Sequence, residues 1–236
     1  MFFDTESYNS QGFSDDIGRS LEKQLIGVVY SVGKVFDDLS ATRMATEEFL
    51  RTDNPEVLGS KADRDLLSDL RDATRFVVDY DYENLPFDTD YLRSINTRIS
   101  RSGALYPGEW RTTEGGVTTV LGHFTPAPVD KNEITQFMEV ADNANSQREG
   151  YVERAVTLFM QLAKAQPFGD GNKRTAMMAA NGLLIKHGSP ILLTVPCEDE
   201  NEIREFIQLM SEWYMESNED AIVWLSEFNK RKQHNE

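Results

Sequence analysis

Residues 165–175, with the sequence AQPFGDGNKRT, bring together side chains that could bind a phosphate and a metal ion. Gly169 and Gly171 permit a positive φ and a close approach of a phosphate to the backbone. Asp170 between them is a hard oxygen ligand of the kind that Mg²⁺ shares with phosphates. An apolar helical pattern precedes this stretch and another follows it. The pattern predicts a glycine-containing loop that opens directly into a helix.

The start of the second helix, near Asn172, is a candidate anion site. The first backbone N–H groups of a helix have no partner within it, and the helix dipole is positive at that end. Arg174 lies in the first turn, where a cation opposes the dipole unless an anion binds, and Lys173 adds a further phosphate contact. By composition alone, an interhelical turn capped by Asp170 or Asn172 explains the loop equally well.

The same stretch resembles the signature of the Fic/Doc (Fido) family, which reads His-Pro-Phe, any residue, Asp or Glu, Gly-Asn, Gly or Lys, Arg. The resemblance extends upstream to residues 106–111 and to residues 116–128, which look like the family's β-hairpin flap, and it covers about residues 90–228. The signature positions that match in order and spacing are Phe168, Asp170, Gly171, Asn172, Lys173 and Arg174.

This resemblance implies a mainly helical core that uses ATP and Mg²⁺ as cofactors. Most members of the family transfer AMP to a protein hydroxyl, whereas Doc-like members transfer a phosphate. Gly171 favours AMP transfer, because Doc-like members tend to have Ala there. The resemblance implies that Asp170 binds the metal, that Asn172, Arg174 and the Gly171 amide hold phosphates, and that Phe168 anchors the loop.

The flap carries the expected partner site. Short β-branched runs broken by a glycine predict a small hairpin, and the resemblance implies that a protein substrate docks on it as an added strand. The expected docking residues are Val117, Thr118, Thr119, Val120, Leu121 and Gly122.

Two positions depart from the family pattern. Gln166 replaces the histidine that takes the proton from the attacking hydroxyl, and a neutral amide cannot act as a general base. Met177 stands where a second arginine usually binds phosphate. We therefore expect a transferase impaired by Gln166. Two alternatives are a degenerate domain that binds a nucleotide or a protein, and a toxin controlled by a separate antitoxin.

Other candidate residues carry weaker signals. His123 at the end of the flap could substitute for the missing base, but a structural or target-contacting role is the preferred interpretation. Thr52 and Glu56 have the spacing of an inhibitory helix known in the family. Pro55 interrupts that pattern and Met177 removes the arginine partner, so a loop near a helix end is preferred.

The elements expected to position these residues are helices. The sequence predicts an all-α fold with a small β-hairpin flap, divided into an N-terminal helical extension (1–88), a Fic-like core (89–230) and a polar tail (231–236). Residues 1–16 form a polar lead-in, and 191–195 are strand-like or extended. The expected helices start at Ile17 and continue at about 41–51, 61–78, 89–100, 132–145, 151–165, 172–187, 198–216 and 221–230.

The amino-acid composition argues against some classes of binding partner. The 236 residues include 40 acidic and 24 basic side chains, for a net charge of −16, which opposes binding to nucleic acid or to anionic membranes. The single cysteine, Cys197, excludes an internal disulfide and a cysteine-based zinc cluster. With no signal peptide or membrane-length apolar run in view, we expect a cytoplasmic protein, or one delivered into a host or target cell without a classical signal.

Overall fold

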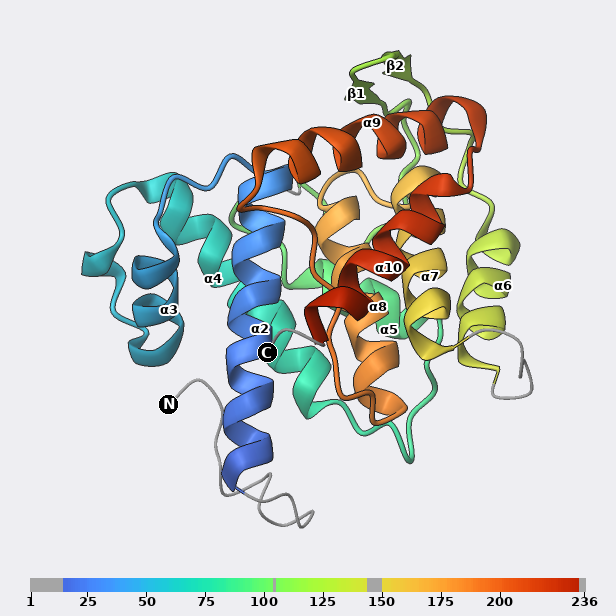
Figure 1. Cartoon of the computed structure of the whole chain (residues 1–236). Helices are drawn as coiled ribbons and strands as arrows, with labels where there is room; N and C mark the ends of the chain where they lie inside the picture. Colours follow the sequence, from blue (N-terminus) through green and yellow to red (C-terminus); the bar gives the residue numbers. More distant parts are fainter. Residues whose placement is uncertain (1–14, 104, 144–149, 234–236) are drawn as a thin grey trace.

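The computed structural model describes residues 15–103, 105–143 and 150–233 and shows a helical assembly with one small β-hairpin at its edge (Figure 1). This confirms the expected fold class. The hairpin is a two-stranded antiparallel sheet. In chain order the elements are α2 (Asp15–Phe36), α3 (Arg43–Thr52), the 3₁₀ turn η1 (Pro55–Val57), α4 (Lys61–Asp79), α5 (Thr89–Thr97), β1 (Val117–Thr119), β2 (Gly122–Phe124), α6 (Lys131–Asp142), α7 (Tyr151–Ala165), α8 (Asn172–Lys186), α9 (Glu200–Glu216) and α10 (Asp220–Gln233).

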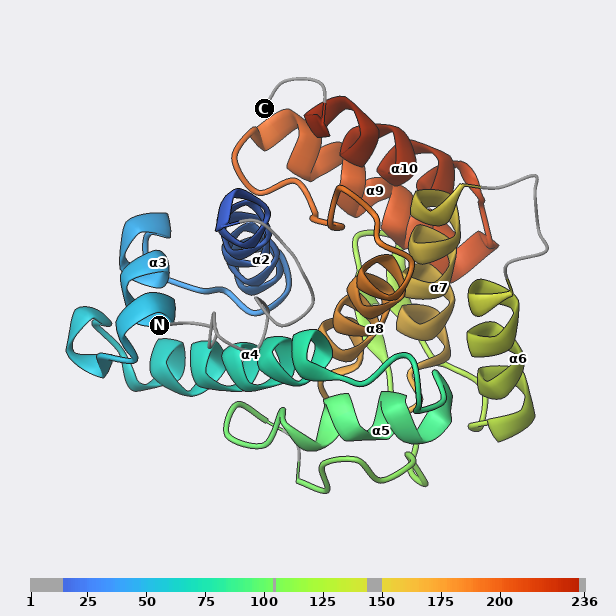
Figure 2. The ribbon, with the colours of Figure 1, turned by 90° about the horizontal axis from the view of Figure 1, so that it is seen from below.

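Helix α8 lies at the centre of the assembly, where α4, α5 and α7 enclose it (Figure 2). Every residue from Arg174 to Leu184 is buried, so the helix has no solvent-facing side over three turns. Small side chains allow this close packing. A Cβ atom at Gly182 would meet the hydroxyl oxygen of Tyr91 at 1.9 Å. The N-terminus of α8, where the candidate anion site begins, is therefore held by a helix that cannot shift independently of the core.

One apolar core joins the N-terminal helices to the rest of the described chain. Leu25 and Val32 of α2, Leu70 of α4 and Leu184 of α8 belong to the same buried cluster. The amphipathic pattern that predicted α2 thus packs it against α4 and α8. As a result the end of α2, at Phe36, reaches the N-terminal end of α8. The division at residue 88 stays a prediction about the organisation of the sequence.

Several boundaries differ from the sequence predictions. The hairpin turn falls at Val120 and Leu121, because Gly122 is already in β2 and pairs with Thr119. Residues 191–195 are extended but do not pair with another strand of the described chain. A side chain accepts a backbone hydrogen bond there in place of a strand, because the N–H of Leu193 donates to Asn181 Oδ1.

Helix ends account for the other differences. Helix α2 begins at Asp15 rather than Ile17, α5 ends at Thr97 rather than residue 100, and α10 runs on to Gln233, into the expected tail. The rest of the polar lead-in, residues 1–14, and the end of the tail, 234–236, lie outside the described residues. In the described part of the chain, no helix combines the length and apolar character needed to cross a membrane.

Candidate functional site

The loop between α7 and α8 is shaped by two residues in the left-handed conformation. Gln166 ends α7 with a φ of 48°, and Gly171 precedes α8 with a φ of 72°. A side chain at position 171 would also press on Ile99, at 3.0 Å, so glycine is required there on both counts. Of the two loop glycines that were expected to permit a positive φ, only Gly171 has one, and Gln166 supplies the other left-handed position.

Asn172 braces the loop from inside. Its Oδ1 accepts from the backbone N–H of Phe168 at 2.8 Å, and its Nδ2 donates to the Phe168 carbonyl at 2.8 Å and to Gln166 Oε1 at 3.1 Å. Both ends of its amide are thus engaged by the loop itself. Phe168 is buried and stacks on Trp110, with ring centroids 5.4 Å apart, as expected for a core anchor.

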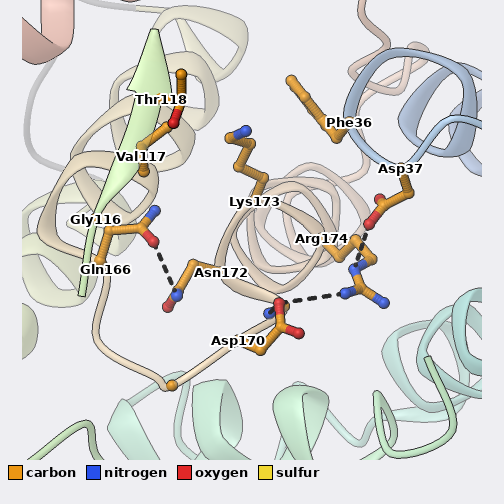
Figure 3. A pocket seen from close by; sticks show the side chains of 12 residues that line it. Phe36, Asp37, Gly116, Val117, Thr118, Gln166, Asp170, Asn172, Lys173 and Arg174 are labelled. Carbon is orange, nitrogen blue, oxygen red and sulfur yellow. Dashed lines mark hydrogen bonds and ion pairs between the residues drawn. The ribbon is translucent and has the colours of Figure 1, made fainter. Parts of the chain in front are cut away.

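A cavity of about 300 Å³ opens at this loop (Figure 3). The structure brings the loop positions predicted for catalysis, phosphate binding and metal binding to it, together with the start of the flap. The predicted docking residues 119–122 do not line it. It also adds the end of α2. The lining residues are Phe36, Asp37, Gly116, Val117, Thr118, Gln166, Gly169, Asp170, Gly171, Asn172, Lys173 and Arg174.

Arg174 is buried and held between two carboxylates. Its Nε lies 3.3 Å from Asp37 Oδ1, its Nη2 lies 3.5 Å from Asp170 Oδ1, and its Nη1 donates to the Ser102 hydroxyl. Only 4% of its side chain is exposed. Two cations, Arg174 and Lys173, therefore face two carboxylates in one cavity, and their formal charges cancel.

Asp37 and its neighbour Phe36 are site residues that the sequence analysis missed. The Oδ1 atom of Asp37 pairs with Arg174, while its Oδ2 is buried without a hydrogen bond. Burial raises the pKa of Asp37, and the nearby Arg174 and Lys173 only partly oppose that rise. Glu56, which had been weighed for an inhibitory role, is exposed in η1 and does not line the cavity. One of the two acidic partners of Arg174 thus comes from the residue that follows α2.

Lys173 points into the cavity between Phe36 and the flap (Figure 3). Its ammonium lies 5.2 Å from the centroid of the Phe36 ring and makes no ion pair or hydrogen bond with any residue that the structure describes. Burial lowers the pKa of Lys173, although Asp37 nearby opposes the shift. Because its proton donors are unused, Lys173 can bind an anion that enters the cavity.

Gln166 is fixed at both ends of its side-chain amide. Its Nε2 donates to the Ala163 carbonyl at 2.5 Å, and its Oε1 accepts from Asn172. No titratable group stands at this position. His123 packs over Gly116 from the flap, so that a Cβ at Gly116 would lie 2.3 Å from its Nε2, but it does not line the cavity. Met177 is fully buried in α8 and supplies no phosphate contact.

Asp170 fits a divalent cation. Its side chain is 47% exposed at the cavity, and Oδ1 accepts from the Gly171 N–H. Oδ2 has no protein partner among the described residues and is left for a metal. The described residues contain no group of three or more His, Cys, Asp or Glu side chains able to hold a metal ion. A cation at Asp170 would therefore need further oxygens, such as those of a bound phosphate.

The family model described as Fic/DOC family matches residues 86–184. This range begins just before α5, includes the flap and the loop, and ends within α8. This part of the chain is similar to Fic/DOC-family domains. The matched range includes Gln166. No curated protein sequence matches the chain significantly.

Solved structures of Fic domain proteins share the fold of this chain. A Fic domain-containing signaling protein from Bacteroides thetaiotaomicron superposes with a TM-score of 0.72 at 18% identity, covering 91% of this chain and 84% of its own. Fic-1 of C. elegans (residues 134–508) gives 0.76 at 16% identity, with 94% of this chain covered but only 65% of its own.

A third example is a Fic family protein from Desulfovibrio desulfuricans, with a TM-score of 0.72, 13% identity and coverage of 96% of this chain and 69% of its own. All three likenesses extend over more than nine-tenths of this chain. They therefore extend well beyond the residues 86–184 that the family model matches. At these identities the likeness concerns the fold.

Proposed function

We propose that this Fic domain binds ATP together with Mg²⁺ and transfers AMP to a protein hydroxyl slowly, because Gln166 stands where a base is needed. The observation that carries the proposal is the meeting of the α8 N-terminus, Lys173, Arg174 and Asp170 in one cavity beside the flap. Free N–H groups, unpaired ammonium protons and an open carboxylate oxygen together suit a metal-bound phosphate chain.

Each group has a distinct part in this proposal. The N–H groups of the first turn of α8 and the ammonium of Lys173 would hold phosphate oxygens. Asp170 would hold the Mg²⁺, which neutralises phosphate charge when bound. The free edge of β1 offers backbone groups to a target segment, since β1 pairs only with β2 among the described residues.

A binding module without catalysis is the second candidate. Two observations favour it. The side-chain amide of Gln166 is hydrogen-bonded at both ends, and Asp37 pairs with the Arg174 guanidinium, which would otherwise be available to phosphate. The toxin hypothesis, with an antitoxin as partner, stays a prediction from sequence. Labelled-ATP transfer assays distinguish the enzyme from the module, because both bind ATP but only the enzyme modifies protein.

Calorimetric titration with ATP, with and without Mg²⁺, tests the proposal. We expect Asp170→Asn to remove most of the gain in ATP affinity that Mg²⁺ provides, because the metal loses a charged ligand. A loss of about 1.5–3 kcal/mol corresponds to roughly 10–150-fold in Kd. Asp65→Asn, which alters a surface ion pair with Lys61, is the control and should bind like the parent. No detectable ATP binding by the folded parent chain would refute the proposal.

Asp37 should make phosphate binding depend on pH. Protonation of its carboxylate breaks the pairing with Arg174 and leaves the cavity with one more positive charge. The pKa of Asp37 is raised, so we expect affinity for inorganic pyrophosphate to increase as the pH falls through that raised pKa. Asp37→Asn should bind pyrophosphate more tightly at neutral pH and lose that increase. Equal affinities of parent and variant across the range would contradict the competition between Asp37 and phosphate.

A further inference from the structure

Arg111 lies at the neck of the flap, outside the lining of the cavity. Its guanidinium donates to three backbone carbonyls: Nε to Gln166 at 2.8 Å, Nη1 to Thr113 at 3.0 Å and Nη2 to Ala127 at 2.7 Å. Thr113 precedes the hairpin and Ala127 follows it. One side chain therefore ties both ends of the flap to the residue at the catalytic position.

The segment that carries Arg111 is itself anchored in the loop. The backbone N–H of Arg111 donates to the Pro167 carbonyl at 2.8 Å, and Trp110 forms an isolated β-bridge with Phe168. Their rings stack with an interplanar angle of 7°. The guanidinium thus extends from a fixed backbone, so the position of the flap neck depends on its three hydrogen bonds.

The chemistry of this contact requires arginine. Arg111 has no carboxylate partner among the described residues, and burial lowers its pKa. A guanidinium stays protonated nonetheless, so its charge is satisfied here by carbonyl dipoles alone. Its planar fork can reach three carbonyls in different directions at once, whereas a lysine ammonium at the end of a flexible stem cannot reproduce that geometry.

Outside the neck, few hydrogen bonds hold the flap to the rest of the described chain, although Val117 and Phe124 pack against the core. Its strands are three residues each, and an isolated two-stranded hairpin is marginal in water. Away from the neck, the backbone N–H of Val120 donates to Ser211 at 3.3 Å, and the Phe124 ring lies 5.2 Å from that of Tyr214. Loss of the Arg111 contacts would free the neck while leaving those contacts in place.

We propose that Arg111 is a positioning residue that sets the flap against residue 166, and so places a docked hydroxyl in line with the phosphates. The inference rests on the proposed function. It separates two properties of the site: the ligands for ATP, which Arg111 does not touch, and the alignment of the acceptor, which depends on it.

The first test measures the flap itself by hydrogen–deuterium exchange of peptides covering residues 113–127. In Arg111→Lys we expect flap amides to exchange about tenfold faster or more, the effect of losing at least one charge-assisted hydrogen bond. The matched control is Arg98→Lys. Arg98 is also partly buried, donates to the Ser94 carbonyl and packs on Phe76, away from the flap. Flap exchange should match the parent in that control.

The second test measures alignment in the Gln166→His background with α-labelled ATP and cell lysate. Transfer to a protein hydroxyl and transfer to water both form a new P–O bond at the α-phosphorus and release pyrophosphate. We expect Arg111→Lys to lower labelled protein about tenfold or more relative to free AMP, with the Kd for Mg–ATP within about twofold of the parent. A merely structural loss would lower both products together.

Three results would overturn the inference. Flap exchange equal to that of the parent in Arg111→Lys would show that the guanidinium does not fix the neck. An unchanged ratio of labelled protein to AMP would show that the neck does not align the acceptor. Weaker Mg–ATP binding in the folded variant would place Arg111 among the ATP contacts instead. Failure of the parent to bind ATP would refute the proposed function separately, and flap exchange in the same chains would still decide whether Arg111 holds the flap.

Discussion

Gln166→His is expected to raise the rate of AMP transfer by about 10²–10⁴-fold, the contribution of a general base. The parent chain should transfer AMP very slowly or not at all. The reason is local: the other candidate groups meet in the cavity, and residue 166 lacks only a group that can take a proton. Labelled ATP, with α- and γ-labels in parallel and cell lysate as the source of targets, measures both the rate and the group transferred.

The loop should accept the histidine. Its conformation is braced by the two hydrogen bonds between Asn172 and the Phe168 backbone, which the substitution leaves intact, and by the contact from Arg111 to the carbonyl of residue 166. The substitution removes the side-chain bonds of Gln166 to Ala163 and Asn172 and its contact with the Tyr214 hydroxyl. Gln166→Ala loses the same bonds without gaining a base, so it is the matched control and should stay as slow as the parent.

Two outcomes would contradict this prediction. Rapid transfer by the parent would mean that another base exists, and His123 on the flap would be the first residue to replace. If neither the parent nor Gln166→His transfers label although both bind ATP, the binding module would be favoured over the enzyme. The γ-label distinguishes a third case, because its appearance on protein would indicate phosphate transfer.

Removal of the guanidinium at Arg174 is expected to weaken ATP binding by roughly 10–150-fold, or about 1.5–3 kcal/mol. Arg174→Ala deletes the buried cation in the first turn of α8, but it also leaves Asp37 as a largely buried carboxylate without its partner. That second effect costs stability and repels phosphate. The double variant Asp37→Asn/Arg174→Ala removes it, so calorimetry on this variant reports the contribution of the guanidinium.

The comparison that isolates Arg174 is between Asp37→Asn and the double variant, because both lack the competing carboxylate. Circular dichroism and thermal melts should confirm that both are folded. Equal ATP affinities in these two chains would show that the guanidinium holds the loop through Ser102 and Asp170 without contacting phosphate. Weaker binding in the double variant supports the phosphate role.

Local patterns were sufficient to predict the loop, the helix that follows it and the flap. The two glycines, the signature residues and the apolar periods on either side all lie within a short stretch, where sequence spacing fixes geometry. The hairpin was predicted correctly but its turn was misplaced, because Gly122 with a φ of 133° belongs to β2 and pairs with Thr119.

The contacts that the sequence did not reveal join distant segments. Asp37 stands 137 positions before Arg174 in the chain, at the end of a helix whose periodicity indicates only that it is amphipathic. Arg111 was visible as part of a family-like segment, but its carbonyl partners belong to the flap neck and to α7. No spacing rule connects such residues. They meet because α2 and α7 pack on the same central helix.

The complete burial of α8 bears on how such a site changes over evolution. From Arg174 to Leu184 each side chain is a packing residue, and Asn172 braces the loop, so substitutions there carry a folding cost whether or not the site is catalytic. Gln166 carries less of that cost, since it ends α7 and contributes two side-chain hydrogen bonds. A lineage that abandoned catalysis would thus be free to change position 166 early and would keep the rest of the signature. In this fold, Asn172 and Arg174 are therefore a record of selection for folding as much as for activity.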